Sequence, residues 1–189
     1  MQFTTRQQSI EQVEADVAVV GVYQDRMTTA AQAVDQATDG LIQRLLESKE
    51  YKPEVGSVQV LYYPSGLKSA ILVLMGLGDS SEFQAGAAFR AAATVGRTLS
   101  SVRRNKLAFA ADESWSSACI ENAVAGSIVG FQGPGLYQSE QKRMPPAELI
   151  WLTADDDAGH NGMLVGQSVN LTRRLVDEPP HAMYPESFA

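Results

Sequence analysis

Cysteine, histidine and long hydrophobic runs are all scarce in this sequence. The single cysteine, Cys119, makes an internal disulfide framework impossible. The two histidines, His160 and His181, occur in no spacing that binds metal, such as the H-E-x-x-H pattern. The longest apolar stretches, VAVVGVY and AILVLMGLG, are far shorter than the about 20 residues that a membrane helix needs. The opening residues contain no apolar run like that of a signal peptide, so we expect a cytoplasmic protein without a membrane partner.

Positive charge is also in the minority. The chain has 15 Lys and Arg residues against 22 Asp and Glu residues, which gives a formal net charge of -7. Non-specific binding to nucleic acid or to anionic membranes requires a positive surface, so neither is an expected partner. Hydrophobic residues make up 44% of the 189 residues and charged residues 20%, which is typical of a soluble protein with a packed core.

Apolar patterns along the chain predict alternating strands and helices. Continuous apolar or β-branched runs predict strands at residues 16–23, 57–64, 69–78, 106–112 and 147–155, the second and third forming a hairpin or neighbouring strands. Helical spacing predicts four helices, carrying Val34 to Leu46 (one helix of about four turns), Ala88 to Val102, Ile120 to Phe131 and Leu164 to Val176. This order predicts an α/β fold, a three-layer sandwich with a mixed, mostly parallel sheet covered by helices on both faces.

Two segments that follow strands carry residue types that could bind a ligand. The turn Gly76–Phe83 precedes a helix, whose free N–H groups attract phosphate, but it lacks the third glycine of the dinucleotide fingerprint. We interpret it as a tight turn in which Asp79, Ser80 or Ser81 caps the next helix. The segment Thr153–His160 contains three aspartates and a histidine and could bind Mg²⁺ or Mn²⁺. Because consecutive Asp side chains point in different directions, we interpret them as caps of the following helix.

The remaining candidates also have a simpler structural explanation. Cys119 lies on a predicted helix beside apolar residues, so we interpret it as a small buried side chain and not as a nucleophile. Arg173 and Arg174 could bind an anionic substrate, but cations near the end of a helix complement its dipole. The sequence contains no G-x-S-x-G motif and no arrangement that assembles a hydrolase triad. The residues alone therefore predict no catalytic, cofactor-binding or metal-binding position.

The last stretch, Gly166–Ala189, resembles the junction segment of leucine aminopeptidases, a family of cytosolic metallo-exopeptidases. That family has a helix with an Asn-x-x-Arg-x-Leu-Val core, then a proline-bearing turn and the start of another helix. His181 stands where the family usually has Asn, and Tyr184 where it usually has Thr. Upstream, ILVLMGLGDSSEF and FRAAATVGRTL resemble the family's Val-Gly-Leu-Gly strand end and its Arg-Ala-Ala-x-x-Gly helix. The matching residues of the tail are Asn170, Arg173, Leu175, Val176, Pro179, Pro185, Phe188 and Ala189.

The resemblance implies a protein of two domains. Residues 1–160 would form an N-terminal α/β domain similar to a macro domain, and residues 161–189 the junction helix and the start of a C-terminal peptidase domain. Pro179 and Pro180 would end the junction helix, since proline lacks the N–H, and Pro185 would lie in the first turn of the next helix. Two divalent metal ions, Zn²⁺ or Mn²⁺, would bind in the peptidase domain and none in this chain, which would be inactive alone.

The implied partners are the chain's own peptidase domain, further copies in a homo-hexamer, and the peptide substrate of the complete enzyme. Two alternatives stay open at this point. The chain could be a macro-like module that binds ADP-ribose or a nucleotide phosphate, although the second glycine-rich phosphate loop of such modules is missing. It could also be a scaffold for oligomerisation.

Overall fold

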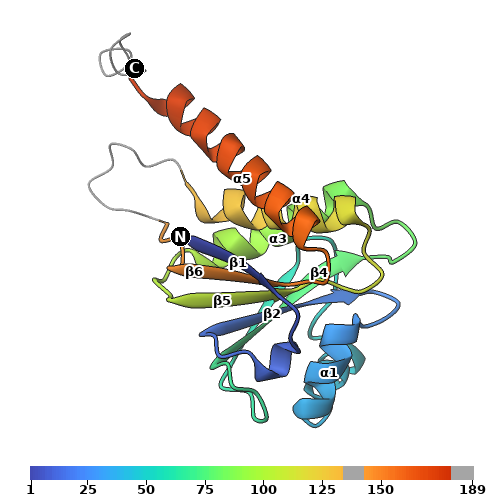
Figure 1. The fold of residues 1–189 in the computed structure, drawn as a ribbon. Coiled ribbons are helices and arrows are strands. Elements are labelled where there is room, and N and C mark those ends of the chain that lie inside the picture. The colour runs from blue at the N-terminus through green and yellow to red at the C-terminus, as the bar shows by residue number, and fades with distance from the viewer. Residues whose placement is uncertain (134–142, 180–189) are drawn as a thin grey trace.

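A computed structural model describes residues 1–133 and 143–179, and Figure 1 shows their fold. The strands in these residues form one sheet in the order β1-β6-β5-β2-β4-β3, in which only β3 is antiparallel to its neighbour. This topology confirms the predicted α/β fold with a mixed, mostly parallel sheet. The strands are β1 (Gln2–Arg6), β2 (Val17–Tyr23), β3 (Val58–Tyr62), β4 (Ile71–Gly78), β5 (Lys106–Ala110) and β6 (Glu148–Leu152).

Helices cover both faces of the sheet, as the three-layer prediction requires. One hydrophobic cluster joins α3 and α4 to one face, and a second cluster joins α1, α2 and the short helix η1 to the other. Figure 1 shows α3, α4 and α5 above the sheet and α1 below it. The helices are η1 (Ile10–Gln12), α1 (Thr29–Ala37), α2 (Leu41–Glu47), α3 (Ala85–Leu99), α4 (Ser117–Phe131) and α5 (Asp156–Asp177).

The central strands β2 and β4 are buried along their whole length. Side chains of β2 alternate between the two clusters, so that Val19 faces α3 and α4 while Val20 faces α1 and α2. A strand with both faces covered needs apolar residues at every position, which explains the continuous run at residues 17–23. β3 pairs with β4 in antiparallel register, with Val60 opposite Val73, and this confirms the predicted hairpin.

Two elements differ from the prediction. The sequence pattern does not predict β1, because its residues QFTTR are polar and form the edge of the sheet beside β6, where they are at most half-buried. The predicted four-turn helix is divided into α1 and α2, because Asp39 and Gly40 have positive φ angles of 53° and 78°. The Asp35 carboxylate accepts hydrogen bonds from the N–H groups of Ile42 and Gln43 and thereby starts α2.

The alanines of α3 pack closely, as predicted. Ala88 and Ala91 are fully buried in the cluster between α3, α4 and the sheet. α3 and α4 approach so closely that a Cβ atom at Gly126 would lie 2.3 Å from the carbonyl oxygen of Phe89. The prediction was wrong about Val102, which lies beyond the end of α3 and is exposed.

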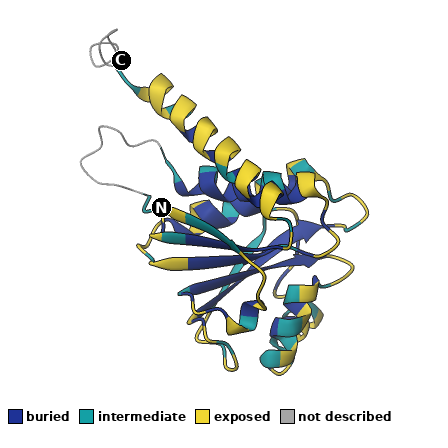
Figure 2. Cartoon of the chain, viewed as in Figure 1, coloured by how far each residue is buried: buried dark blue, intermediate teal, exposed yellow. Residues whose placement is uncertain are grey.

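The last helix, α5, extends well beyond the sheet (Figure 1). It packs on α4 through small residues, since a Cβ atom at Gly162 would lie 2.4 Å from the carbonyl oxygen of Glu121. Figure 2 shows that much of the surface of α5 is exposed. The helix ends at Asp177, before the first of the two prolines as predicted, and the helix start predicted at Pro185 lies outside the described residues. Within the two described ranges, no helix is long and apolar enough to cross a membrane.

Candidate functional site

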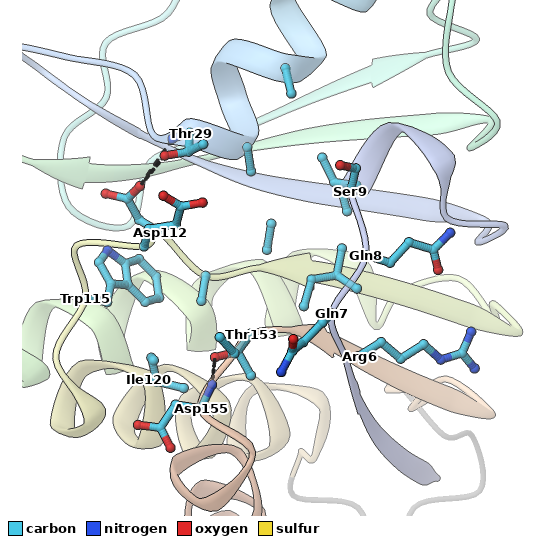
Figure 3. A pocket seen from close by; sticks show the side chains of 18 of the residues that line it. Arg6, Gln7, Gln8, Ser9, Thr29, Asp112, Trp115, Ile120, Thr153 and Asp155 are labelled. Carbon is cyan, nitrogen blue, oxygen red and sulfur yellow. Dashed lines mark hydrogen bonds between the residues drawn. The ribbon is translucent and has the colours of Figure 1, made fainter.

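A pocket of about 580 Å³ lies at the carboxyl ends of β1, β5 and β6 (Figure 3). At this edge the chain leaves β2 toward α1 on one face of the sheet and leaves β5 toward α4 on the other. Open α/β sheets bind ligands at such switch points, because the diverging connections leave a crevice outside the strand ends. The volume is also that of ordinary small-molecule sites. This pocket is therefore the candidate functional site.

The pocket combines apolar walls with an excess of acidic side chains. Its apolar lining residues include Ala30, Ala33, Ala110, Trp115, Ile120 and Leu152. Its charged residues are Arg6, Glu11, Asp112, Glu113 and Asp155. Four carboxylates thus face one guanidinium, which gives the lining a negative formal charge.

Asp112 is the buried carboxylate of the pocket, and it is held by partners from the connection between β2 and α1 and from its own loop. One of its oxygens accepts a hydrogen bond from the backbone N–H of Thr29, at 3.2 Å, at the start of α1. The other accepts from the guanidinium of Arg26 at 3.0 Å and from the hydroxyl of Ser114 at 2.6 Å. Only 2% of the Asp112 side chain is exposed, so these charge-assisted bonds fix both the carboxylate and the loop that carries it.

Aromatic side chains support the pocket from behind. The indole N–H of Trp115 donates to the hydroxyl of Tyr23 at 2.8 Å, and the Trp115 ring stacks on Phe83 with 5.1 Å between centroids. The Arg26 guanidinium lies 4.4 Å above the Tyr23 ring. Burial raises the pKa of Tyr23 to about 12, so the phenol is neutral near pH 7. The cluster thereby fixes the orientation of the Trp115 ring.

Three helices begin around the pocket, and in each of them at least one N-terminal N–H group already has a partner in the chain. Asp112 accepts from Thr29 in α1, the Ser116 hydroxyl accepts from the N–H of Cys119 in α4, and Asp155 accepts from the N–H of Ala158 in α5. Helix N-termini bind phosphate through free N–H groups and through the positive end of the dipole. Because the chain's own oxygens use these donors and the lining is acidic, nothing here supports the macro-like alternative.

The turn Gly76–Phe83 is structural. A Cβ atom at Gly76 would lie 2.2 Å from the carbonyl oxygen of Glu54, so the glycine permits close packing of the segment before β3. The Asp25 carboxylate accepts hydrogen bonds from the N–H and the hydroxyl of Ser80, and these bonds lower the pKa of Asp25. The predicted capping was wrong, since α3 begins after Gln84 and the Asp79–Ser81 residues form a separate turn before it.

The cluster Thr153–His160 is the cap of α5, as interpreted from the sequence. Asp155 is the N-cap residue and also accepts a hydrogen bond from the Ser117 hydroxyl at 2.6 Å. These bonds lower the pKa of Asp155. The Nδ1 atom of His160 lies 2.9 Å from the carbonyl oxygen of Asp156 on its own helix. In the part of the chain that the structure describes, no three His, Cys, Asp or Glu side chains are grouped for a metal ion.

Cys119 and the two arginines also have structural positions. Cys119 is buried in the cluster between α4 and the sheet. Arg173 donates to the carbonyl oxygens of Val129 and Gln132, at the carboxyl end of the neighbouring helix α4. Arg174 pairs with Glu178 across one turn. Both arginines thus lie near the carboxyl end of a helix, where the helix dipole favours positive charge. For Arg173 this is the end of α4 and not the end of its own helix.

The fold and the pocket define an α/β domain with a mostly parallel sheet. Comparison with protein families then identifies the domain. Residues 19–138 match the model of the cytosol aminopeptidase family, N-terminal domain. The chain therefore belongs to this family, which confirms the resemblance to leucine aminopeptidases.

Similar proteins with assigned names support this family membership. A probable cytosol aminopeptidase of Rhodopirellula baltica is 36% identical over 118 residues, which are 62% of this chain and 23% of that protein. Another, of Streptomyces avermitilis, is 30% identical over 203 residues, with 94% of this chain and 39% of the relative covered. The chain thus spans about a quarter to two fifths of the length of these relatives.

Solved structures share the fold. A tomato leucine aminopeptidase mutant superposes with a TM-score of 0.77 at 18% identity, covering 100% of this chain and 40% of that one. The bottromycin maturation enzyme BotP in complex with Mn gives a TM-score of 0.69 at 22% identity, covering 92% of this chain and 34% of that one. At these identities the likeness concerns the fold alone.

Sequence reasoning did not find the pocket. Its charged residues Asp112 and Asp155 follow β5 and β6, which are separated by more than thirty residues in the chain. A usable signal was present, because the segments AADES and LTADDD place polar residues directly after two predicted parallel strands. Parallel neighbours end at the same edge of a sheet, so these residues had to meet if the strands were adjacent.

Proposed function

We propose that the chain is the non-catalytic N-terminal domain of a leucyl aminopeptidase whose complete form releases N-terminal amino acids from peptides. Family membership supports this, as does the match of nearly the whole chain to about two fifths of a named relative. Residues 1–160 would form the domain, and residues 161–189 the junction helix and the start of the peptidase domain. The complete protein would be cytoplasmic and homo-hexameric.

Two divalent cations, zinc or manganese, would be bound by the peptidase domain. There they would polarise the scissile carbonyl and lower the pKa of a bridging water, which makes a nucleophile near neutral pH. BotP, which shares the fold of this chain, is described in complex with Mn. This chain would position the peptidase domain, since its long last helix, α5, would connect the two domains.

An exposed apolar surface on α5 is the observation that carries this proposal. Six of the eleven large apolar side chains that are exposed among the described residues belong to α5. We call this surface the outer face of α5, and its residues are Leu164, Val165, Val169, Leu171, Leu175 and Val176. A concentration of exposed large apolar side chains on one helix indicates an interaction site, because water exposure of such side chains is unfavourable.

The peptidase domain of the same polypeptide is the partner proposed for the outer face. α5 lies beyond residues 19–138, the part that matches the N-terminal family model, and it extends away from the sheet (Figure 1). A domain joined directly to α5 meets the outer face at a high effective concentration, so even a modest apolar contact would be stable. The outer face would then be an interdomain contact in the complete enzyme.

An activity assay tests the assignment of catalysis. The purified 189-residue chain is incubated with leucine p-nitroanilide and with Zn²⁺ or Mn²⁺, alongside the complete protein. We expect metal-dependent hydrolysis by the complete protein and none by the 189-residue chain. Metal-dependent hydrolysis that copurifies with the shorter chain would refute the non-catalytic role.

Hydrogen exchange on the complete protein tests the docking of the outer face. Exposing two buried leucines to water costs about 3 kcal/mol or more, so Leu164→Gln combined with Leu171→Gln should speed exchange at the interface markedly. Gln43→Ala, an exposed residue of α2 on the other face of the sheet from α5, is the control and should leave exchange unchanged. Equal exchange in both variants would show that the outer face is not an interdomain contact.

A further inference from the structure

We propose that β3, which forms one edge of the sheet, pairs with β3 of a second copy of this chain and thereby joins two sheets across a two-fold axis. The contact is independent of the proposed aminopeptidase role, because it concerns an edge of the N-terminal domain itself. Three features of the strand support it: backbone groups without a partner in the described residues, the absence of charge, and an exposed aromatic side chain.

The hydrogen bonds between β3 and β4 show which backbone groups of β3 face the sheet. The N–H of Tyr63 donates to the carbonyl oxygen of Ala70 at 2.7 Å. At the other end of the strand, the N–H of Gly76 donates to the carbonyl oxygen of Ser57 at 2.8 Å. Hydrogen-bonded pairs alternate along an antiparallel ladder, so positions 57, 59, 61 and 63 direct their backbone groups toward β4.

The residues between these positions direct their backbone groups away from the sheet. They are Val58, Val60 and Tyr62, and their N–H and C=O groups have no hydrogen-bond partner among the described residues. A row of free N–H and C=O groups at the edge of a sheet is a template on which another strand can pair. β3 therefore offers three residues for such pairing.

β3 lacks the features that usually block an edge strand. The segment SVQVLYYP, residues 57–64, contains no charged residue, and its proline follows the strand. The register with β4 continues through the strand without a bulge. β1, at the opposite edge of the sheet, carries Arg6, whose guanidinium binds the Glu148 carboxylate at 3.0 Å. Charged side chains discourage the pairing of edges, so β3 is the more open of the two edges.

The free edge of β3 is complementary to itself. When Val60 lies opposite Val60 of the second copy in antiparallel register, Val58 of each copy lies opposite Tyr62 of the other. All outward residues then form hydrogen-bonded pairs, with two bonds in each pair. A shift by two residues brings in either Gly56, where a φ angle of 83° turns the backbone, or Pro64, which has no N–H. This self-match, without any charge to repel an identical strand, favours a second copy over an unrelated peptide, and a two-fold contact closes at a dimer.

The side chains fit the same register. Val58 and Val60 pack against the hydrophobic cluster of α3 and α4, and Tyr62 lies two residues further along, on the same face of the sheet. The Tyr62 side chain is 64% exposed. In the proposed pair each Tyr62 ring contacts Val58 of the other copy, and cross-strand pairs of an aromatic and a β-branched residue stabilise sheets. Because a pair of five-residue strands is a small interface, we expect a weak dimer.

Sedimentation analysis of the 189-residue chain tests the proposal. We expect a monomer–dimer equilibrium between micromolar and millimolar protein concentration. Tyr62→Lys places a charge on the shared edge and should weaken dimerisation by about tenfold or more. Val102→Lys, at an exposed apolar residue beyond the end of α3, makes the same change in net charge and should leave the equilibrium unchanged. A monomer at every concentration, or equal dimerisation by the two variants, would overturn the proposal.

Val60→Pro tests the backbone pairing directly. Proline lacks the N–H group that Val60 would donate to the second copy, and no bond to β4 uses this group. We expect a folded, monomeric variant, with folding checked by thermal unfolding. Val60→Ile keeps the N–H group and an apolar side chain, so it should dimerise as the wild type does. A folded proline variant that still dimerises would contradict the pairing, and Tyr62→Lys decides the question if the proline variant does not fold.

Hydrogen exchange followed by NMR locates the contact. In concentrated protein the amides of Val58, Val60 and Tyr62 should be protected, and dilution should remove this protection. The amides of Gln59 and Leu61 should stay protected at both concentrations, because they bond to β4. Outward amides that exchange freely in the dimer would place the contact elsewhere, such as on the outer face of α5. Protection that persists in the dilute monomer would show that another segment of the chain covers the edge, and either result would refute the proposal.

Discussion

The two sides of α5 differ in the size of their side chains, and the side with the smaller residues is the one that packs. Its inner face, defined by Gly159, Gly162, Gly166 and Asn170, is buried, mainly against α4. Its outer face carries large aliphatic side chains, of which Leu171 is 57% exposed. Hydrophobicity alone would have chosen the opposite orientation, so close backbone approach decides which face packs inside this domain.

The physical reason lies in the distance between the helices. Glycines let two backbones approach, which brings many atoms into contact at once although each contact is weak. A Cβ atom at Gly166 would lie 2.9 Å from Cβ of Ile128, so no larger residue can replace Gly166 without moving α5. The outer aliphatic residues are then left for a second partner. The following predictions test this division between an inner face that stabilises the chain and an outer face that does not.

The largest effect is expected for Gly162→Ala. The new Cβ atom would lie 2.4 Å from the Glu121 carbonyl oxygen, so α5 must move away from α4. We expect the free energy of unfolding to fall by about 3 kcal/mol, even after the gain in helix propensity. Gly86→Ala in α3 is the control, because nothing lies within 4 Å of its Cβ position, and it should stabilise the chain slightly. Equal urea-unfolding curves for the two variants would show that close approach at Gly162 is unimportant.

A smaller loss is expected for Asn170→Ala. The buried Asn170 side chain donates to the carbonyl oxygen of Ile128 at 3.1 Å and accepts from Arg173. Removing it leaves both groups without that partner, which should cost about 2 kcal/mol. Asn161→Ala, an exposed asparagine of the same helix, should change stability little. If urea unfolding shows the same cost at both positions, helix propensity and not the contact with α4 explains the result.

Asp155→Asn should have a smaller effect that depends on pH. Hydrogen bonds from Ser117 and from the N–H of Ala158 lower the pKa of Asp155 in the folded chain. The ionised form therefore contributes stability above the unfolded-state pKa of about 3.9, and this contribution is lost as pH falls through the lower folded value. Asparagine retains the cap but not the charge. The difference in unfolding free energy between wild type and variant should be largest above pH 5 and should vanish in acid; a difference independent of pH would exclude this linkage.

The sequence predicted the interior of the sheet better than its margins. β2 and β4 are buried on both faces, so every position had to be apolar and the runs were unmistakable. β1 lies at the edge with polar residues, and its pairing with β6 is a long-range contact that no local pattern records. The break between α1 and α2 had a signal in the Asp39-Gly40 pair, a common turn sequence, but the helical periodicity on either side concealed it.

The candidate site was less predictable than the family. The tail pattern around Asn170 and Arg173 marked the family, and the structure shows why these residue types matter: both bind carbonyl oxygens near the end of α4. The pocket, however, is assembled from four separate segments, and its shape depends on which strands are neighbours. Spacing along the chain identified Asp155 as a cap but could not show that Asp112 lies across the same cavity.

The smallest effect on the free energy of unfolding is expected for substitutions on the outer face of α5, in contrast to those on its inner face. Leu164→Gln combined with Leu171→Gln replaces two side chains that are 56% and 57% exposed. Because surface substitutions of this kind change little, the unfolding free energy of the 189-residue chain should move by less than about 0.5 kcal/mol. Urea unfolding at two protein concentrations checks this. A large loss that grows with protein concentration would mean that copies of the chain bury the outer face against each other, so that both faces of α5 stabilise the folded state.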